Sequence, residues 1–181
     1  DRLLGVVKTI GLTRIGVVYA AQPQAQAQAV LNLVNAQVKK HGLELVSSAS
    51  IPHTGSTQVK PAVAQLAAST AQVIIVGLAG PAPDFMIGAR PAGVAVPVYT
   101  VSNAVTPTLF SRLKGPARGV GFSSAIPSPW DRSIEIVRQY QAGQARKNVP
   151  SDAWSFNSVE GYINARLLVQ VLQRSGPEPH R

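Results

Sequence analysis

Polar and glycine residues that could hold a small ligand occur at three places where an apolar run of the chain ends. The segments AQPQ, LAGPAP and SNAV follow the runs LTRIGVVYA, VIIVG and VPVYTV, respectively. Gly77 and Gly80 would let a ligand approach backbone amides, and Ser102 with Asn103 offers hydrogen-bond donors and an acceptor. Each of these residue types is also ordinary in turns. The prediction of a binding site therefore depends on whether the fold gathers the three segments at one place.

Patterns typical of catalysis, phosphate binding or metal ligation are missing from the sequence. It contains no GxSxG nucleophile turn, no GxGxxG after the first apolar run and no GxxxxGK[ST] loop. The three histidines have no spacing that would place two on one helix face, and there is no cysteine. Asp84, Asp131 and Glu135 are interpreted as acids at helix starts, where they complement the helix dipole. We therefore expect no enzyme activity, no cofactor and no bound metal.

The composition favours a globular protein over a disordered or membrane-spanning one. Hydrophobic residues make up 45% of the chain, but the longest apolar windows are far shorter than the ~20 residues that cross a bilayer. The formal charge is +9, yet the 17 Lys and Arg residues never exceed two in a row, so we do not expect nucleic acid as a partner. No leader is visible at Asp1, and the lack of cysteine is consistent with an exported bacterial protein.

Apolar runs of strand type alternate about five times with segments of helical periodicity before residue 127. Strands are expected at residues 12–20, 43–51, 73–76, 96–102 and 119–126, and helices at residues 1–11, 24–42, 56–70, 83–93 and 106–115. In the longest helical segment the residues expected on the buried face are Val30, Leu31, Val34 and Val38. The alternation predicts an α/β fold with a doubly wound parallel sheet of about five strands.

The alternation stops at Pro127. Two helical segments, residues 130–147 and 158–175, then follow in succession with no strand between them. We therefore expect an α/β ligand-binding lobe over residues 1–126 and a C-terminal helical segment over residues 127–181 that ends in a polar tail. The second helix carries an apolar stripe broader than one neighbour can cover. We expect it to pack on the first helix and on a partner.

The predicted fold indicates where a ligand would bind. In an open parallel sheet, ligands lie beyond the carboxyl ends of the strands, near the point where the strand order reverses. The three polar segments each follow a predicted strand, so the fold would bring them to this edge. The predicted ligand-binding residues are Gln22, Gln24, Leu78, Ala79, Gly80, Ser102 and Asn103.

Several strings, in the order found here, resemble the type I periplasmic binding proteins, specifically the leucine/isoleucine/valine-binding-like receptors of ABC transporters. They are TRIGVVYA, STQVKPAVAQLAASTAQVIIVG, RGVGFSSAIPSPW, IVRQYQAG and SVEGYINARLLVQVLQRSG, of which the last is the most specific. The resemblance implies a protein of two α/β lobes. This chain is similar to the second lobe alone, and its two C-terminal helices would belong to the first lobe.

The resemblance also implies a function. Such receptors are periplasmic, hold an amino acid or related carboxylate between their lobes and deliver it to a membrane permease. A missing first lobe or a second copy of the chain would then cover the C-terminal helices. The family often has an acidic residue and an aromatic-glycine pair after the first strand of this lobe. Here the segment reads AAQPQA, with Gln24 near the place of the aromatic residue and Ala25 near that of the glycine.

Two other functions would use the same sheet edge. A small flavodoxin-like enzyme would need a convergent acid, base or phosphate-binding loop, and the sequence offers none. A ligand-sensing domain of a larger regulator would share the fold, and a DNA-binding or kinase segment in the same reading frame would distinguish it from a transport receptor.

Overall fold

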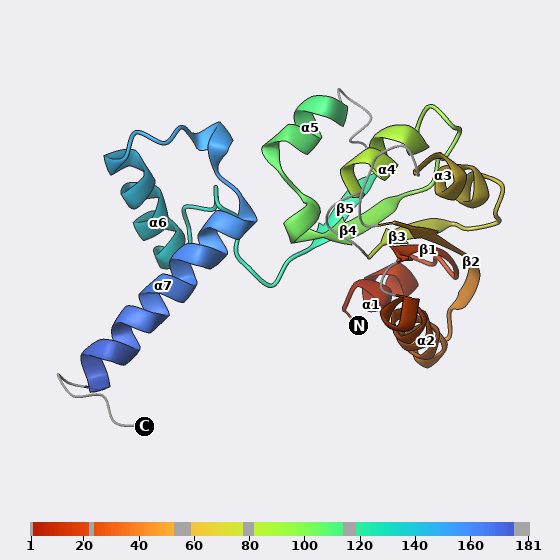
Figure 1. Ribbon diagram of the computed structural model, residues 1–181, viewed down its shortest axis with the longest axis horizontal. Helices are drawn as coiled ribbons and strands as arrows, with labels where there is room; N and C mark the ends of the chain where they lie inside the picture. The colour runs from red at the N-terminus through yellow and green to blue at the C-terminus, as the bar shows by residue number, and fades with distance from the viewer. Residues whose placement is uncertain (1, 22–23, 53–58, 78–81, 114–118, 176–181) are drawn as a thin grey trace. The chain divides into compact units, whose positions relative to one another are not determined.

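A computed structural model describes residues 2–21, 24–52, 59–77, 82–113 and 119–175 (Figure 1). Its internal contacts separate two compact units, Asp1–Ser123 and Ser124–Arg181. The first unit carries a β-sheet with helices on both faces, and the second is built from helices.

In the described part of the chain, five parallel strands form one sheet, which confirms the predicted fold class. The strands are β1 Arg14–Ala20, β2 Glu44–Ile51, β3 Val73–Val76, β4 Val98–Val101 and β5 Val120–Ser123. Their order across the sheet is β2-β1-β3-β4-β5. β1 lies between β2 and β3, and its Ile15 is opposite Val73. Runs of Val and Ile favour these strands because both faces of the sheet are covered.

Helices cover the two faces of this sheet (Figure 1). On one face lie α1 Arg2–Thr9 and α2 Gln24–Lys40, and on the other lie α3 Val59–Ala67, α4 Ala82–Ala89 and α5 Pro107–Leu113. Successive residues of a strand point to opposite faces. Val17 therefore packs with the residues of α1 and α2, whereas Val18 packs with those of α3, α4 and α5.

The core on the side of α3, α4 and α5 is the larger of the two. Phe85 and Met86 of α4 are buried together with Val63 and Leu66 of α3 against the sheet. The helical periodicity predicted for α3 is confirmed, since Val59, Val63 and Leu66 are each no more than 4% exposed. Packing of α3 and α4 on this side of the sheet sets where each helix begins relative to the end of the strand before it, β2 for α3 and β3 for α4.

The predicted buried face of α2 is only partly correct. Val38 is 1% exposed and Val34 packs on the core, but Val30 is 42% exposed. The buried Ala27 stands seven residues before Val34 and eleven before Val38, so these three point in one direction on a helix. Val30 lies at the border of that stripe. α2 ends at Lys40, two residues before the predicted end at residue 42, with Lys39 and Lys40 in its last turn and with Gly42 just beyond it at a φ of +68° that suits glycine.

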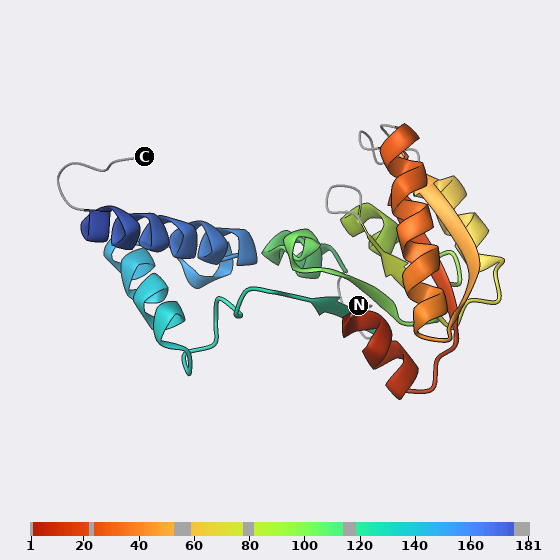
Figure 2. The same ribbon diagram turned by 90° about the horizontal axis from the view of Figure 1, so that it is seen from below.

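In the second unit, α6 Glu135–Arg146 and α7 Phe156–Ser175 pack together (Figure 2). α6 begins later than the predicted residue 130, because the carboxylate of Asp131 accepts hydrogen bonds from the N–H and hydroxyl of Ser133 at 3.0 and 2.6 Å. This local turn competes with helix formation. Ile134, which precedes the helix, has extended backbone angles.

Tyr140 is the centre of the packing between α6 and α7. It is 1% exposed, its ring lies 6.0 Å from that of Trp154 and 5.8 Å from that of Tyr162, and its hydroxyl lies 2.7 Å from Ser158 Oγ. These edge-to-face contacts are favourable arrangements of aromatic rings. They confirm the prediction that the last helix packs on the preceding one.

The C-terminal half of α7 has a different environment. Val159, near its start, is 0% exposed, whereas large apolar side chains farther along are 50–59% exposed: Leu167, Leu168, Val169, Val171 and Leu172. No helix within the described ranges is both long and apolar enough to cross a membrane.

Replacing Gly16 with alanine should destabilise the first unit by about 1–3 kcal/mol. A Cβ at this position would lie 2.4 Å from Leu66 Cδ1 and 3.2 Å from Ala71 Cβ. Urea unfolding measures the change. Gly5→Ala in α1 is the control: nothing lies within 4 Å of its new methyl group, so it should stabilise by about 0.5–1 kcal/mol. A Gly16→Ala protein as stable as the parent would show that Leu66 moves without cost.

Candidate functional site

The strands place three chain segments together at one edge of the sheet. β1, β3 and β4 are consecutive neighbours in a parallel sheet, so their carboxyl ends emerge side by side. The chain leaves β1 for α2 and β2 on one side, and leaves β3 for α4 and β4 on the other. The strand order therefore reverses between β1 and β3, which is the position where open α/β sheets bind ligands.

Three of the seven predicted site residues are among the described residues, and they lie directly at strand ends or at the start of the following helix. Gln24 is the first residue of α2, Ser102 opens the 3₁₀ helix Ser102–Ala104 directly after β4, and Asn103 lies within that helix. The other predicted residues fall outside the described residues: Gln22, Leu78, Ala79 and Gly80. Among the described residues, Ala21, Gly77 and Ser102 mark where the three strands end.

Backbone hydrogen bonds continue past the ends of the strands. The N–H of Ala21 donates to the carbonyl of Ile51 at 2.9 Å, and that of Gly77 donates to the carbonyl of Val18 at 2.8 Å. The N–H of Val105 donates to the carbonyl of Ser102 at 3.0 Å and closes the 3₁₀ turn. The starts of the connections after β1 and β3 are thus held by neighbouring strands, and the start of the connection after β4 is held by its own 3₁₀ turn.

A buried hydroxyl ties two of these ends together. Thr100 is 0% exposed, and its Oγ1 donates to the carbonyl of Val76 at 3.1 Å. Thr100 is on β4 and Val76 is the last residue of β3, so the bond links the strands just before their connections begin. Sequence reasoning did not select Thr100. The available signal was the threonine within the apolar run VPVYTV.

A small apolar cavity reaches the same edge from the side of α1 and α2. Its volume is about 220 Å³, and Tyr19 and Gly77 line it at the ends of β1 and β3. The rest of the lining is apolar apart from Gln37: Leu3, Leu4, Val17, Val18, Val30, Leu33, Val34 and Ile75. Tyr19 is only half-buried. Tyr19 was not predicted as a site residue. The register of β1 decides whether its side chain lies on the face covered by α1 and α2 or on the opposite face.

Asp84 and Glu135 lie in the first turns of α4 and α6 as predicted, whereas Asp131 lies four residues before α6, so its interpretation as a helix-start acid was wrong. Asp84, in the first turn of α4, pairs with Arg112 at 2.8 Å. Hydrogen bonds from the hydroxyl and the N–H of Ser133 lower the pKa of Asp131, and hydrogen bonds from Gln139 and Arg138 lower that of Glu135. Within the described ranges, no three His, Cys, Asp or Glu side chains are grouped in a way that could hold a metal ion.

Comparison with known proteins gives a consistent result over the whole chain. A family model described as periplasmic binding protein matches residues 1–181. The chain is similar to a substrate-binding periplasmic protein from Ralstonia solanacearum, with 28% sequence identity and a TM-score of 0.84. It is also similar in fold to an extracellular ligand-binding receptor from Verminephrobacter eiseniae, with 24% identity and a TM-score of 0.81. Each alignment covers 99% of this chain and 50% of the relative.

A third structure, an ABC-transporter solute-binding protein from R. palustris in complex with 4-hydroxybenzoate, has 19% identity and a TM-score of 0.72. That alignment covers 98% of this chain and 48% of the other. The chain thus spans about half the length of these structural relatives. A comparison with curated sequences finds no match.

Thr100→Val should lower the free energy of unfolding by about 1 kcal/mol, because the isosteric side chain cannot donate to the Val76 carbonyl. Thr70→Val, at an exposed position, should change it by less than about 0.5 kcal/mol. Chemical denaturation of both variants checks the difference. Equal effects of the two substitutions would mean that the Thr100 hydroxyl does not hold β3 to β4.

Proposed function

Because the chain belongs to the periplasmic binding protein family, we propose that it is a solute-binding component of an ABC transporter and binds a small polar ligand at the carboxyl edge of its sheet. The observation that carries the proposal is the reversal of strand order between β1 and β3, combined with a family match over the whole chain. The protein would act in the periplasm by binding and release, without catalysis, and would present its ligand to a membrane permease.

The chemistry of the edge suits an amino acid or related carboxylate. Backbone N–H groups and amide and hydroxyl side chains can hold a carboxylate and an amine without a buried counter-charge. The residues proposed to contact the ligand are Gln22, Gln24, Leu78, Ala79, Gly80, Ser102 and Asn103. Tyr19 adds an aromatic side chain beside Gly77, where it could contact an apolar part of the ligand.

A second surface is needed to enclose the ligand. The chain spans half the length of its structural relatives, and we propose that residues 127–181 belong to the partner lobe formed by the remainder of such a protein. The exposed apolar half of α7 supports this, because contiguous apolar surface in a monomer marks an interaction site. Closure of two lobes would be driven by tighter binding of the ligand to the closed form.

Titration of the ¹⁵N-labelled chain with amino acids and with aliphatic and aromatic carboxylates tests the site. One class of ligand should shift the amide resonances of Ala21, Gly77 and Ser102 at millimolar concentration, since contacts from the other lobe are absent. Ser102→Ala should weaken this binding several-fold, whereas Ser69→Ala, which precedes β3 at the opposite edge, should not. The proposal is wrong if shifts arise only at the opposite edge, and micromolar affinity would contradict the need for a second lobe.

The exposed half of α7 should make the isolated chain self-associate through this helix. Leu168→Glu combined with Leu172→Glu should convert associated species into monomer, because both side chains are more than half exposed in the apolar stripe. Light scattering at high concentration measures the mass. Gln170→Glu with Gln173→Glu adds the same charge elsewhere on α7 and should leave association unchanged. A parent chain that is strictly monomeric would contradict the prediction.

A further inference from the structure

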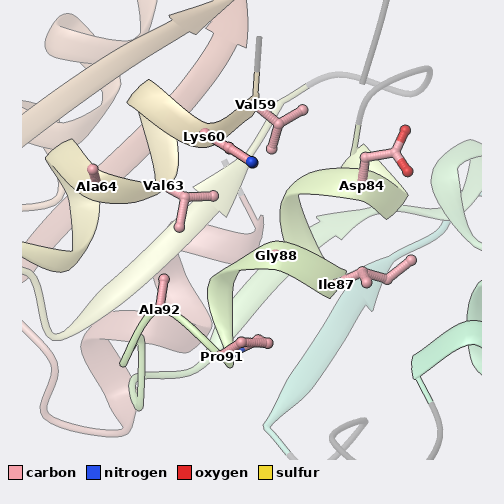
Figure 3. Close-up of a pocket in the computed structure, with 9 residues that line it drawn as sticks. All are labelled: Val59, Lys60, Val63, Ala64, Asp84, Ile87, Gly88, Pro91 and Ala92. Atoms are coloured by element: carbon pink, nitrogen blue, oxygen red, sulfur yellow. The ribbon is translucent and has the colours of Figure 1, made fainter. Parts of the chain in front are cut away.

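A groove runs between α3 and α4 on the outer side of the helix layer (Figure 3). Its volume is about 520 Å³. Val59 and Val63 are buried at its base, and Ala64, Ile87, Pro91 and Ala92 contribute further apolar lining. None of these residues was predicted to take part in binding. The lining residues lie in α3, in α4 or just after α4, and none of them is a residue proposed to contact the ligand at the strand ends.

One end of the groove is charged. Figure 3 shows the Lys60 side chain reaching from α3 toward α4, with Asp84 at the start of α4. Asp84 is already paired with Arg112 at 2.8 Å. Within the described ranges, no carboxylate is ion-paired with Lys60. The three charges at this end, two positive and one negative, therefore leave an excess of one positive charge beside an apolar channel.

We propose that this groove binds an amphipathic monocarboxylate, with the carboxylate at Lys60 and an aliphatic tail along Val63, Ile87 and Ala92. The excess positive charge specifies an anionic head, and the apolar lining specifies an uncharged tail. At roughly 30 Å³ for a water-sized group, a volume of about 520 Å³ holds about 17 such groups, which is more than enough for the eight carbons and two oxygens of octanoate. An amino acid does not fit this description, because its ammonium group would lie beside Lys60.

Titration of the ¹⁵N-labelled chain with sodium octanoate below its micellar concentration tests the proposal. Amide resonances of α3 and α4 should shift, and the affinity should rise about two- to fourfold for each methylene from hexanoate to octanoate. Lys60→Met keeps a long apolar stem, and it should weaken octanoate about fivefold while leaving 1-octanol unchanged. The matched control Lys39→Met, in the last turn of α2, should have no effect on either compound.

Ala64→Phe provides a second variant. Ala64 is exposed and lines the groove, so a phenyl ring there should block both octanoate and octanol without disturbing the core. No shift in α3 and α4, shifts confined to α7, or equal losses in Lys60→Met and Lys39→Met would each overturn the proposal. Binding in the groove is read from the amides of Val63, Ala64 and Gly88, which lie away from the first turn of α4. Binding at the strand ends is read from Ala21, Gly77 and Ser102, so either proposal can fail without the other.

Discussion

The pairing of β1 on both of its edges is the constraint on which the first unit depends. Parallel strands all begin at one edge of a sheet and end at the other. The pairing of Ala20 with Ile51 and of Val18 with Val76 therefore brings the ends of β1, β2 and β3 to one line. The chain leaves β1 and β3 in opposite directions, so an opening between the two connections follows from strand order alone. Strand order therefore determines where the proposed site lies, whatever side chains line it.

Glycine permits the close packing that keeps this edge in place. Gly16 leaves room for Leu66, which lets α3 approach β1. Gly121 does the same for the ring of Tyr99, since an added Cβ on β5 would lie 2.5 Å from that ring. Both contacts cross between neighbouring elements at positions where any side chain would push them apart. The connections at the carboxyl edge thus extend from a sheet whose strands have little freedom to shift.

The strands and helix stops could be predicted because their signals are local. A run such as Val73–Val76 identifies a buried strand by itself, and the glycine at 42 ends α2 through its own backbone preference. The exposure of Val30 could not be predicted from its apolar character, because it depends on which stripe of α2 faces the sheet, and Ala27, Val34 and Val38 form that stripe with Val30 at its border. The candidate site likewise depends in part on packing that local sequence does not show. Strand ends gave its location, but the roles of Tyr19 and Thr100 depend on register and on which face each side chain occupies.

In the proposed function, both units need a surface that the partner lobe supplies. Packing around Tyr140 covers the start of α7, while Leu168 and Leu172 remain more than half exposed, and a helix is stabilised mainly by burial of its apolar face. The sheet edge is equally one-sided, because its connections can contact a ligand from a single direction. The structural relatives are about twice as long as this chain, so one added lobe could meet both needs. A ligand favours closure only by binding the closed form more tightly, and in the proposed function the contacts that make this difference come from the second lobe.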